Sequence, residues 1–283
     1  MSPKHGHKVK LAYQDPNFMD SAAARPVRII TEYLDPLARL RREGVADTIV
    51  MFGSARILPK DRAEQRLKLA RKAAAKHRTP ATLDRLRLSR YALDMSHYYE
   101  EARELSRLIT SWSMSFGDRP RRFVVCSGGG PGIMEAANRG AADAGGKSVG
   151  LSIELPHEQA PNPYISRELS FNFHYFFMRK LWFAQIAKAL IVFPGGFGTL
   201  DELWEMMTLS QTGKMPKHTI IIIYGRKYWN EVLKLENMVR WGTISQADFD
   251  NLQYADSVDE AFDKIRMGLE KYHMEGDPFL QAY

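Results

Sequence analysis

The stretch from Ala189 to Glu202 constrains the fold of this chain more than any other part of its sequence. Five apolar residues, 189–193, form a run of the length of a buried strand, and three glycines follow within four positions. Thr199 then opens an amphipathic helical pattern. A strand that passes through a glycine-rich turn into a helix presents backbone N–H groups without intrahelical acceptors, and the helix dipole favours negative charge there. This stretch therefore predicts an anion-binding site.

Apolar runs of the same kind recur along the chain and alternate with helical patterns. Buried strands are predicted at 47–52, 122–126, 148–153, 168–173, 188–193 and 219–224. Helices are predicted at 25–42, 89–112, 133–144, 176–187, 199–212, 227–238, 245–251 and 258–272. Continuous apolar strands between helices indicate a parallel sheet that is covered on both faces. The expected fold is α/β, a doubly wound parallel sheet of the Rossmann-like type with a helical N-terminal extension.

The start of the strand pattern divides the chain. Residues 1–44 are expected to form a tail and a helical extension, and residues 45–283 the Rossmann-like domain, with a basic helical insertion at about 59–90 that is interrupted near Pro80. Residues 60–90 hold eleven Lys or Arg and three acidic residues, a net +8, whereas the whole chain carries +7. A solvated helical face accounts for this charge, and an anionic partner is the alternative. Nucleic acid is disfavoured as that partner because aromatic side chains do not interleave the basic ones.

Cysteine content and hydropathy indicate a cytoplasmic protein. Cys126 is the single cysteine, which excludes an intramolecular disulfide, and it lies in an apolar run that predicts a buried side chain. No apolar run approaches the roughly 20 residues that cross a bilayer, so no membrane partner is expected. The residues after Met1 lack the apolar segment of a signal peptide.

Three predicted strands end in residues that suit a phosphate-bearing ligand, namely Gly53-Ser54, Gly128–Gly132 and Gly195–Gly198. In an open parallel sheet, ligands bind outside the carboxyl ends of the strands at the switch point. Neither glycine-rich turn has the Gly-Lys-Ser/Thr sequence of a P-loop, and neither has the spacing of the dinucleotide fingerprint. Tight strand-to-helix turns alone would also explain these glycines, and this alternative stays open.

Glu202 is an unusual neighbour for a phosphate. Thr199 and Glu202 have the spacing of a capping box, in which the glutamate bonds back to the cap backbone. A carboxylate in this place can instead activate water or stabilise positive charge on a sugar ring, as in glycosidic cleavage. Spacing alone leaves both interpretations open.

Other charged and polar residues have two interpretations each. Arg179 and Lys180 lie among bulky apolar residues, so their charges either extend to the surface or face an anion. Glu135 lies in the first turn of its helix, where its negative charge either interacts favourably with the helix dipole or contacts a ribose hydroxyl. Asn138 is expected on the exposed side of that helix. The histidines lack the spacing of metal ligands, so no metal site is expected.

Together these segments resemble the paired signatures of the Lonely Guy (LOG) family, in its long bacterial type. Ser127-Gly-Gly-Gly-Pro-Gly-Ile-Met-Glu135 resembles the first signature, and Pro194-Gly-Gly-Phe-Gly-Thr-Leu-Asp-Glu202 matches the second, P-G-G-x-G-T-x-x-E. Met178-Arg179-Lys180 matches the arginine-lysine helix start of the family, and the resemblance covers residues 45–265. Members were formerly labelled lysine decarboxylases, but nothing in this sequence supports a pyridoxal enzyme. The N-terminal helices and the basic insertion depart from the short, plant-like form.

The resemblance implies hydrolysis of the N-glycosidic bond of a purine nucleoside 5′-monophosphate, either AMP or a cytokinin riboside monophosphate. The products are the free base and ribose 5-phosphate, and no cofactor is required. The resemblance implies that Arg179 and Glu202 are the catalytic pair. The substrate-binding residues that it implies are Gly53, Ser54, Gly128, Gly129, Gly130, Met134, Glu135, Lys180, Gly195, Gly196, Gly198 and Thr199.

The same resemblance also bears on partners. Family members form homodimers or higher homo-oligomers with active sites near the subunit interface. Some LOG-like proteins instead carry the molybdenum cofactor, a phosphate-bearing pterin, so a non-catalytic carrier is the alternative function.

Overall fold

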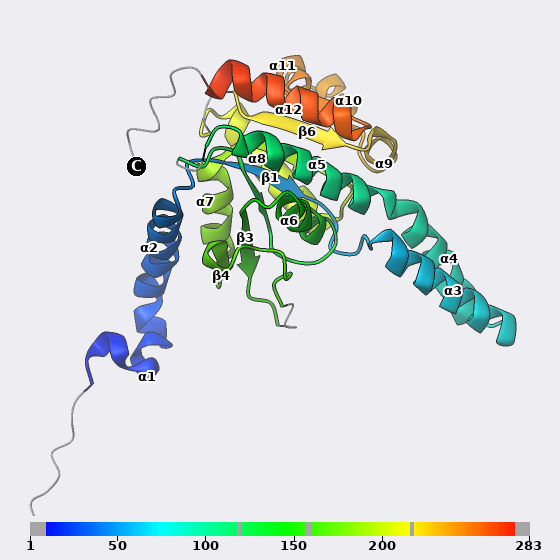
Figure 1. Ribbon diagram of the computed structural model, residues 1–283, viewed down its shortest axis with the longest axis horizontal. Coiled ribbons are helices and arrows are strands. Elements are labelled where there is room, and N and C mark those ends of the chain that lie inside the picture. The colour runs from blue at the N-terminus through cyan, green and yellow to red at the C-terminus, as the bar shows by residue number, and fades with distance from the viewer. Residues whose placement is uncertain (1–9, 118–119, 157–159, 216–217, 275–283) are drawn as a thin grey trace, which may run out of the picture.

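A central parallel sheet organises the protein, which a computed structural model describes at residues 10–117, 120–156, 160–215 and 218–274 (Figure 1). The sheet has seven strands in the order β4-β3-β2-β1-β5-β6-β7, and every neighbouring pair is parallel. The strands are β1 (Thr48–Phe52), β2 (Val124–Ser127), β3 (Ser148–Ile153), β4 (Ser170–Phe173), β5 (Ala187–Val192), β6 (Ile220–Tyr224) and β7 (Leu252–Ala255). The predicted α/β fold with a parallel sheet is confirmed.

Helices cover both faces of this sheet. One face packs against α5 (His97–Met114), α6 (Ile133–Asp143) and α12 (Val258–His273). The other face packs against α2 (Arg25–Glu43), α7 (Phe176–Ile186), α8 (Phe197–Gln211) and α9 (Arg226–Val232). Successive residues of each strand point to opposite faces, so Ile49 joins one core and Val50 the other. This two-sided burial explains why β1, β5 and β6 contain continuous apolar runs rather than an alternating pattern.

Two helices project from the body of the protein as a hairpin (Figure 1). α3 (Lys60–Lys76) packs against α4 (Pro80–Met95), and it buries Ala63, Leu67 and Ala70. Thr79 caps α4 through a capping box with Thr82, and Pro80 occupies the first helical position. The segment expected to be a basic helical insertion is thus helical, with its break immediately before Pro80. The division of the chain into an extension and a domain at residues 44 and 45 stays a prediction.

The remaining elements refine the predicted boundaries. The helix expected at 89–112 is divided between two helices, since α4 ends at Met95 and α5 starts at His97. Ser96 lies between them, and its hydroxyl donates a hydrogen bond to the Leu93 carbonyl. The helix expected at 227–238 is likewise divided into α9 and α10 (Leu235–Arg240) by an extended Leu233. The edge strand β7 was not predicted, since its four residues include two that are not buried. Within residues 10–24, short helical turns precede α2, namely η1 (Ala12–Gln14), α1 (Pro16–Met19) and η2 (Ala22–Ala24). The part of the expected tail before residue 10 lies outside the described residues.

Two smaller elements complete the described chain, η3 (Arg167–Leu169) before β4 and α11 (Gln246–Asp250) before β7. Cys126 is completely buried in β2, as expected for a small core residue, and burial raises the pKa of its thiol. None of the helices that the structure describes is long and apolar enough to cross a membrane.

Candidate active site

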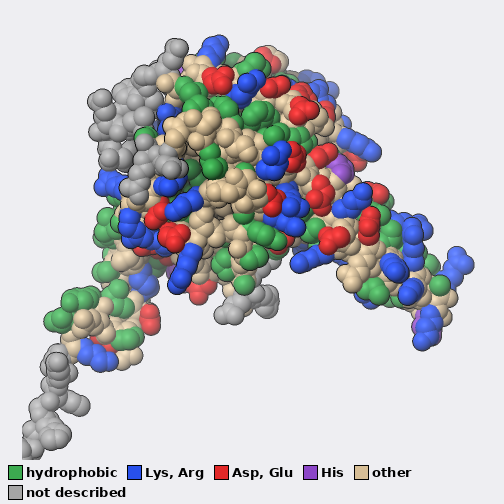
Figure 2. Space-filling model, in the orientation of Figure 1, with side chains coloured by type: hydrophobic (Ala, Val, Ile, Leu, Met, Phe, Trp, Pro, Cys, Tyr) green, Lys and Arg blue, Asp and Glu red, His purple; other side chains and the backbone are tan. Residues whose placement is uncertain are grey.

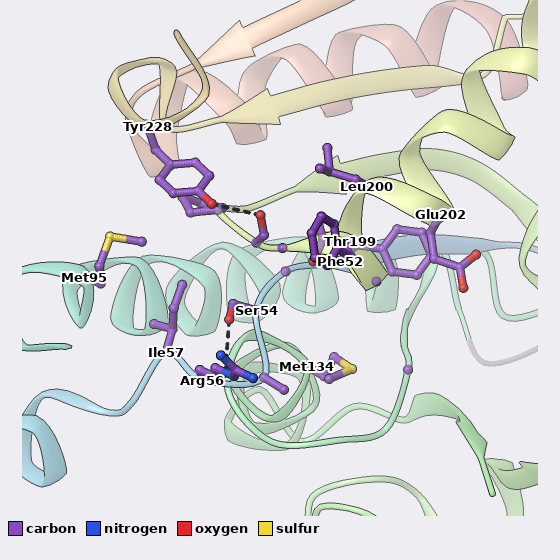
Figure 3. Close-up of a pocket in the computed structure, with 18 of the residues that line it drawn as sticks. Phe52, Ser54, Arg56, Ile57, Met95, Met134, Thr199, Leu200, Glu202 and Tyr228 are labelled. Carbon is purple, nitrogen blue, oxygen red and sulfur yellow. Dashed lines mark hydrogen bonds between the residues drawn. The ribbon is translucent and has the colours of Figure 1, made fainter. Parts of the chain in front are cut away.

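The candidate site lies where the strand order reverses. After β1 the chain builds β2, β3 and β4 on one side, then crosses to β5 and continues outward on the other side. The carboxyl ends of β2, β1 and β5 therefore lie next to one another, and each leads into one of the three predicted turns. A cavity of about 990 Å³ opens at this edge of the sheet (Figure 3).

Backbone hydrogen bonds tie the three turns together. Ser54 N–H donates to the Pro194 carbonyl at 3.0 Å, and Ile133 N–H donates to the Ser54 carbonyl at 3.2 Å. Gly132 adopts a φ of +68°, and a Cβ there would lie 2.3 Å from the Ser54 carbonyl oxygen, so only glycine fits. The turn after β1 is thus clamped between the other two, and their ligand-facing backbones form one surface.

The helix that follows β5 starts earlier than the sequence indicated. α8 begins at Phe197 after the N-cap residue Gly196, and no side chain caps it. Thr199 is therefore the third helical residue rather than the cap. Of the two interpretations that the spacing of Thr199 and Glu202 left open, the capping box is wrong. A Cβ on Gly195 would lie 2.1 Å from Thr199 Oγ1, which shows how closely the threonine hydroxyl overlies this turn. The uncapped end of α8 leaves backbone N–H groups directed at the cavity.

Glu202 instead forms an ion pair with Arg179, from α7. Arg179 Nη2 donates to Glu202 Oε1 at 2.7 Å, and only 4% of Glu202 is exposed. The guanidinium lies over the rings of Phe176 and Phe183, at 5.1 and 5.8 Å from their centroids. Burial raises the pKa of Glu202, and the nearby charges of Arg179 and Lys180 oppose this shift without cancelling it. Both members of the pair line the cavity.

Lys180 is occupied by acidic residues of α8. Its Nζ lies 2.8 Å from Asp201 Oδ2 and 2.7 Å from Glu205 Oε2, and 4.0 Å from Glu202 Oε2. Lys180 does not line the cavity, although the sequence placed it among the substrate-binding residues. In this structure it fixes α7 against α8 and so holds Arg179 opposite Glu202.

Asn138 holds the turn after β2, and the expectation that it lies on an exposed side of its helix is wrong. The residue is fully buried and accepts a hydrogen bond from Ser127 Oγ at 2.7 Å. Its amide donates to Ser148 Oγ at 3.0 Å. The Asn162 amide donates to Asn138 Oδ1 and to the carbonyl oxygens of Gly129 and Gly130. This buried network sets the path of the first glycine-rich turn.

The structure brings most of the predicted site residues to the cavity and leaves four outside it. The predicted residues that line it are Gly53, Ser54, Gly128, Met134, Arg179, Gly195, Gly196, Gly198, Thr199 and Glu202. The predicted residues outside the lining are Gly129, Gly130, Glu135 and Lys180. Gly129 and Gly130 direct their carbonyl groups at Asn162, as described above. Glu135 accepts a hydrogen bond from Tyr99 Oη at 2.7 Å, which joins α6 to α5.

Most of the lining residues that the sequence did not indicate come from the basic insertion and from α9. The hairpin contributes Arg66, Leu88, Tyr91, Ala92 and Met95, and further lining comes from Arg56, Ile57, Phe183, Tyr228 and Val232. Tyr228 Oη donates to the Gly195 carbonyl at 2.9 Å, which supports the turn after β5 (Figure 3). The one signal in the sequence was that Tyr91 and Met95 share an apolar stripe. Both residues line the cavity, and Met95 also packs against the core.

The polar groups at the cavity define its chemistry. They are the backbone of three turns, an uncapped helix N-terminus, one carboxylate and the guanidinium groups. Such a set can bind an anionic group and place a carboxylate beside it. Among the residues that the structure describes, no group of three or more His, Cys, Asp and Glu side chains is arranged to hold a metal ion.

Comparison with known proteins gives one family and several relatives. A family model described as "Possible lysine decarboxylase" matches residues 134–265. The "Probable cytokinin riboside 5'-monophosphate phosphoribohydrolase LOG4" of Oryza sativa subsp. japonica is 29% identical over 145 residues, which are 50% of this chain and 61% of the relative. The "Cytokinin riboside 5'-monophosphate phosphoribohydrolase" of Rhodococcoides fascians is 26% identical over 152 residues, 52% of this chain and 75% of the relative.

Solved structures with similarity include a molybdenum cofactor binding protein from Rippkaea orientalis. It has a TM-score of 0.42 and 18% sequence identity, and the match covers 60% of this chain and 86% of that chain. The "Moco Carrier Protein from Chlamydomonas reinhardtii" also has a TM-score of 0.42, with 20% identity over 62% of this chain and 89% of that chain.

Proposed function

We propose that this chain, which belongs to the LOG family, is a hydrolase that cleaves the N-glycosidic bond of purine nucleoside 5′-monophosphates to free base and ribose 5-phosphate. The substrate is AMP or a cytokinin riboside monophosphate. The observation that carries the proposal is the buried pair of Arg179 and Glu202, which lies in the same cavity as the uncapped start of α8. The names of the rice and Rhodococcoides fascians relatives, both phosphoribohydrolases, support the reaction type.

The 5′-phosphate is expected at the start of α8. Gly198 has no atom within 4 Å of the position that a Cβ would occupy, and its φ is not positive, so neither packing nor backbone geometry requires glycine there. The missing side chain instead leaves open space directly at the helix N-terminus. Backbone N–H groups and the helix dipole favour a phosphate in that space.

Glu202 then acts on the sugar. The bond from C1′ to the base nitrogen breaks as positive charge develops on the ribose ring, and the carboxylate stabilises that charge. A water molecule bonds to C1′ and gives one proton to Glu202. The departing base takes the bonding electron pair and picks up a proton from solvent, and Glu202 then releases its proton to solvent, so that one water is consumed in all. The raised pKa of Glu202 makes it a stronger base than an ordinary glutamate. Arg179 keeps the carboxylate ionised and oriented through the 2.7 Å hydrogen bond.

Replacement of the carboxylate tests this proposal. Glu202→Gln removes the base while it keeps the shape of the side chain, and it is expected to lower the rate of adenine release from AMP by about 100-fold or more. Glu270→Gln is the matched control, because Glu270 is exposed on α12 and does not line the cavity. Full activity of the Glu202→Gln protein would contradict the assignment. A non-catalytic carrier of a phosphate-bearing pterin predicts no base release from any purine monophosphate.

A further inference from the structure

The cavity extends well beyond the catalytic pair. Its volume of about 990 Å³ is at the upper end of the range of about 300–1,000 Å³ that is usual for ligand pockets. Figure 3 shows Glu202 at one end and Met95 with Tyr228 at the other, with Ser54 and Thr199 between them.

The proposed function fixes which part of a nucleotide lies near the end that holds Met95. The 5′-phosphate sits at the start of α8, and the ribose C1′ lies toward Glu202, so the base lies on the Glu202 side of the phosphate, where Phe52 and Met134 also line the cavity. The end lined by the α3–α4 hairpin is then on the opposite side of the phosphate. A ligand reaches it only by a group that is bonded to that phosphate.

Two arginines line this second end. Arg56 follows the turn after β1 and Arg66 comes from α3, and both side chains are exposed. Neither forms an ion pair with any residue in the described parts of the chain, whereas Arg179 is already paired with Glu202. A second negative charge on the ligand would therefore meet the guanidinium groups of Arg56 and Arg66.

Apolar side chains lie beside these arginines. Tyr91 is 57% exposed and Leu88 44% exposed on α4, and Val232 of α9 is 47% exposed, yet all three line the cavity. Ile57 and Met95 complete the same wall. Exposed apolar side chains gathered around a concave surface are typical of a ligand site, and a tyrosine face is suited to stacking on an aromatic ring.

We propose that the hairpin end of the cavity binds the part of a nucleotide that continues beyond its 5′-phosphate. A second phosphate faces Arg56 and Arg66, and an aromatic group packs against Tyr91 and Met95. The ligand class is a dinucleotide whose two nucleosides are joined through a diphosphate. The inference rests on the proposed function, because that function places the first phosphate.

The charge of the hairpin agrees with this ligand class. Many Lys and Arg side chains lie on the hairpin surface that Figure 2 shows, among hydrophobic and acidic ones, and residues 60–90 carry a net +8. A positive field of this kind raises the local concentration of ligands that carry more than one negative charge.

Calorimetry with three ligands of increasing length tests the proposal in the full chain. The Glu202→Gln protein is used because the substitution slows turnover during the measurement. In this protein, diadenosine 5′,5″-diphosphate is expected to bind about tenfold more tightly than AMP, and ADP is expected to bind with an intermediate affinity. Arg66→Gln is expected to weaken the dinucleotide and ADP about tenfold with a much smaller effect on AMP. Tyr91→Ala is expected to weaken the dinucleotide about tenfold without weakening ADP. Arg62→Gln, an exposed position on α3 outside the cavity, is the matched control and leaves all three affinities unchanged.

Two results would overturn the proposal. One is equal affinity of the Glu202→Gln protein for the dinucleotide, ADP and AMP. The other is a loss of the same size for all three ligands in Arg66→Gln, which indicates a general effect of charge. Failure of the wild-type protein to release adenine from AMP contradicts the proposed hydrolysis instead, and it leaves this comparison of affinities unaffected because binding alone is measured.

Discussion

At the scale of single residues, Glu202 shows what a sequence pattern leaves open. Its spacing from Thr199 fitted a helix cap as well as a catalytic base, and only the position where α8 begins distinguishes the two. The glutamate bonds to Arg179, 23 residues earlier in the chain. Local spacing carries no information on such a contact between two helices, because it depends on how α7 and α8 pack against each other.

The protonation of Glu202 gives a prediction on pH. Burial raises the pKa of this carboxyl, so it becomes protonated at a higher pH than an ordinary glutamate, whose pKa is about 4.3. Because the proposed reaction needs the ionised form, kcat/KM for AMP is expected to fall as pH decreases through that raised pKa. Arg179 lowers the same pKa, so Arg179→Gln should move the acid limb of the pH profile to still higher pH. An acid limb that stays in place in Arg179→Gln would show that another group titrates.

Two glycines of one turn are expected to respond differently to alanine. A Cβ on Gly195 would meet Thr199 Oγ1 at 2.1 Å, so Gly195→Ala should lower the free energy of unfolding by about 1–3 kcal/mol. Gly198 has open space around it, so Gly198→Ala should change stability by less than about 1 kcal/mol. Its methyl group nevertheless occupies the proposed phosphate position and should raise the KM for AMP about tenfold. Urea denaturation and initial rates measure the two effects, and an unchanged KM in Gly198→Ala would place the phosphate elsewhere.

At the scale of elements, the strands and the turns at their ends were predictable from the sequence. The side chains from other elements that hold these turns in place were not. The runs 49–52, 189–192 and 220–224, within β1, β5 and β6, are continuously apolar because both faces of these strands are buried, which a sequence displays directly. The turn after β2 was recognised by its glycines. Its support by the Asn138 side chain was missed, since an asparagine in a helix is usually exposed and its partners lie on β3 and in a later loop.

The Asn138 network makes a prediction on stability. Asn138→Leu leaves the hydroxyls of Ser127 and Ser148 and the amide of Asn162 without their buried partner. The free energy of unfolding is expected to fall by about 2–3 kcal/mol, measured by urea denaturation. Asn172→Leu is the control, because Asn172 is exposed on β4. Equal effects of the two substitutions would show that the network does not stabilise the turn.

At the scale of the whole molecule, the reversal of strand order at β1 was the decisive feature. Three glycine-bearing strand ends can meet only if their strands are neighbours in the sheet. The general rule that ligands bind at the switch point of a doubly wound sheet predicts this from the sequence, and the strand order agrees with it. The contribution of the α3–α4 hairpin to the cavity could not be anticipated in the same way. Its helices belong to no strand–helix repeat, so their direction relative to the sheet follows from side-chain packing alone.

Self-association is a prediction at the same scale. The apolar side chains of Ile30 and Leu34 on α2 are 55% and 51% exposed, and Phe177 on α7 is 50% exposed. Burial of such a surface in a homo-oligomer agrees with the expectation from the family resemblance. Light scattering should give at least twice the mass of one chain for the wild type and a reduced mass for Ile30→Glu. Leu69→Glu, an exposed position on α3, is the control, and a wild type that scatters as a monomer contradicts the prediction.

The products formed from AMP test the central claim most directly. Chromatography of a reaction with purified wild-type protein should show adenine and ribose 5-phosphate in equal amounts, and the Glu202→Gln protein should form neither at a comparable rate. This result requires cleavage between C1′ and the base. Adenosine with inorganic phosphate as products, or unchanged AMP after prolonged incubation with the wild-type protein, would contradict the account.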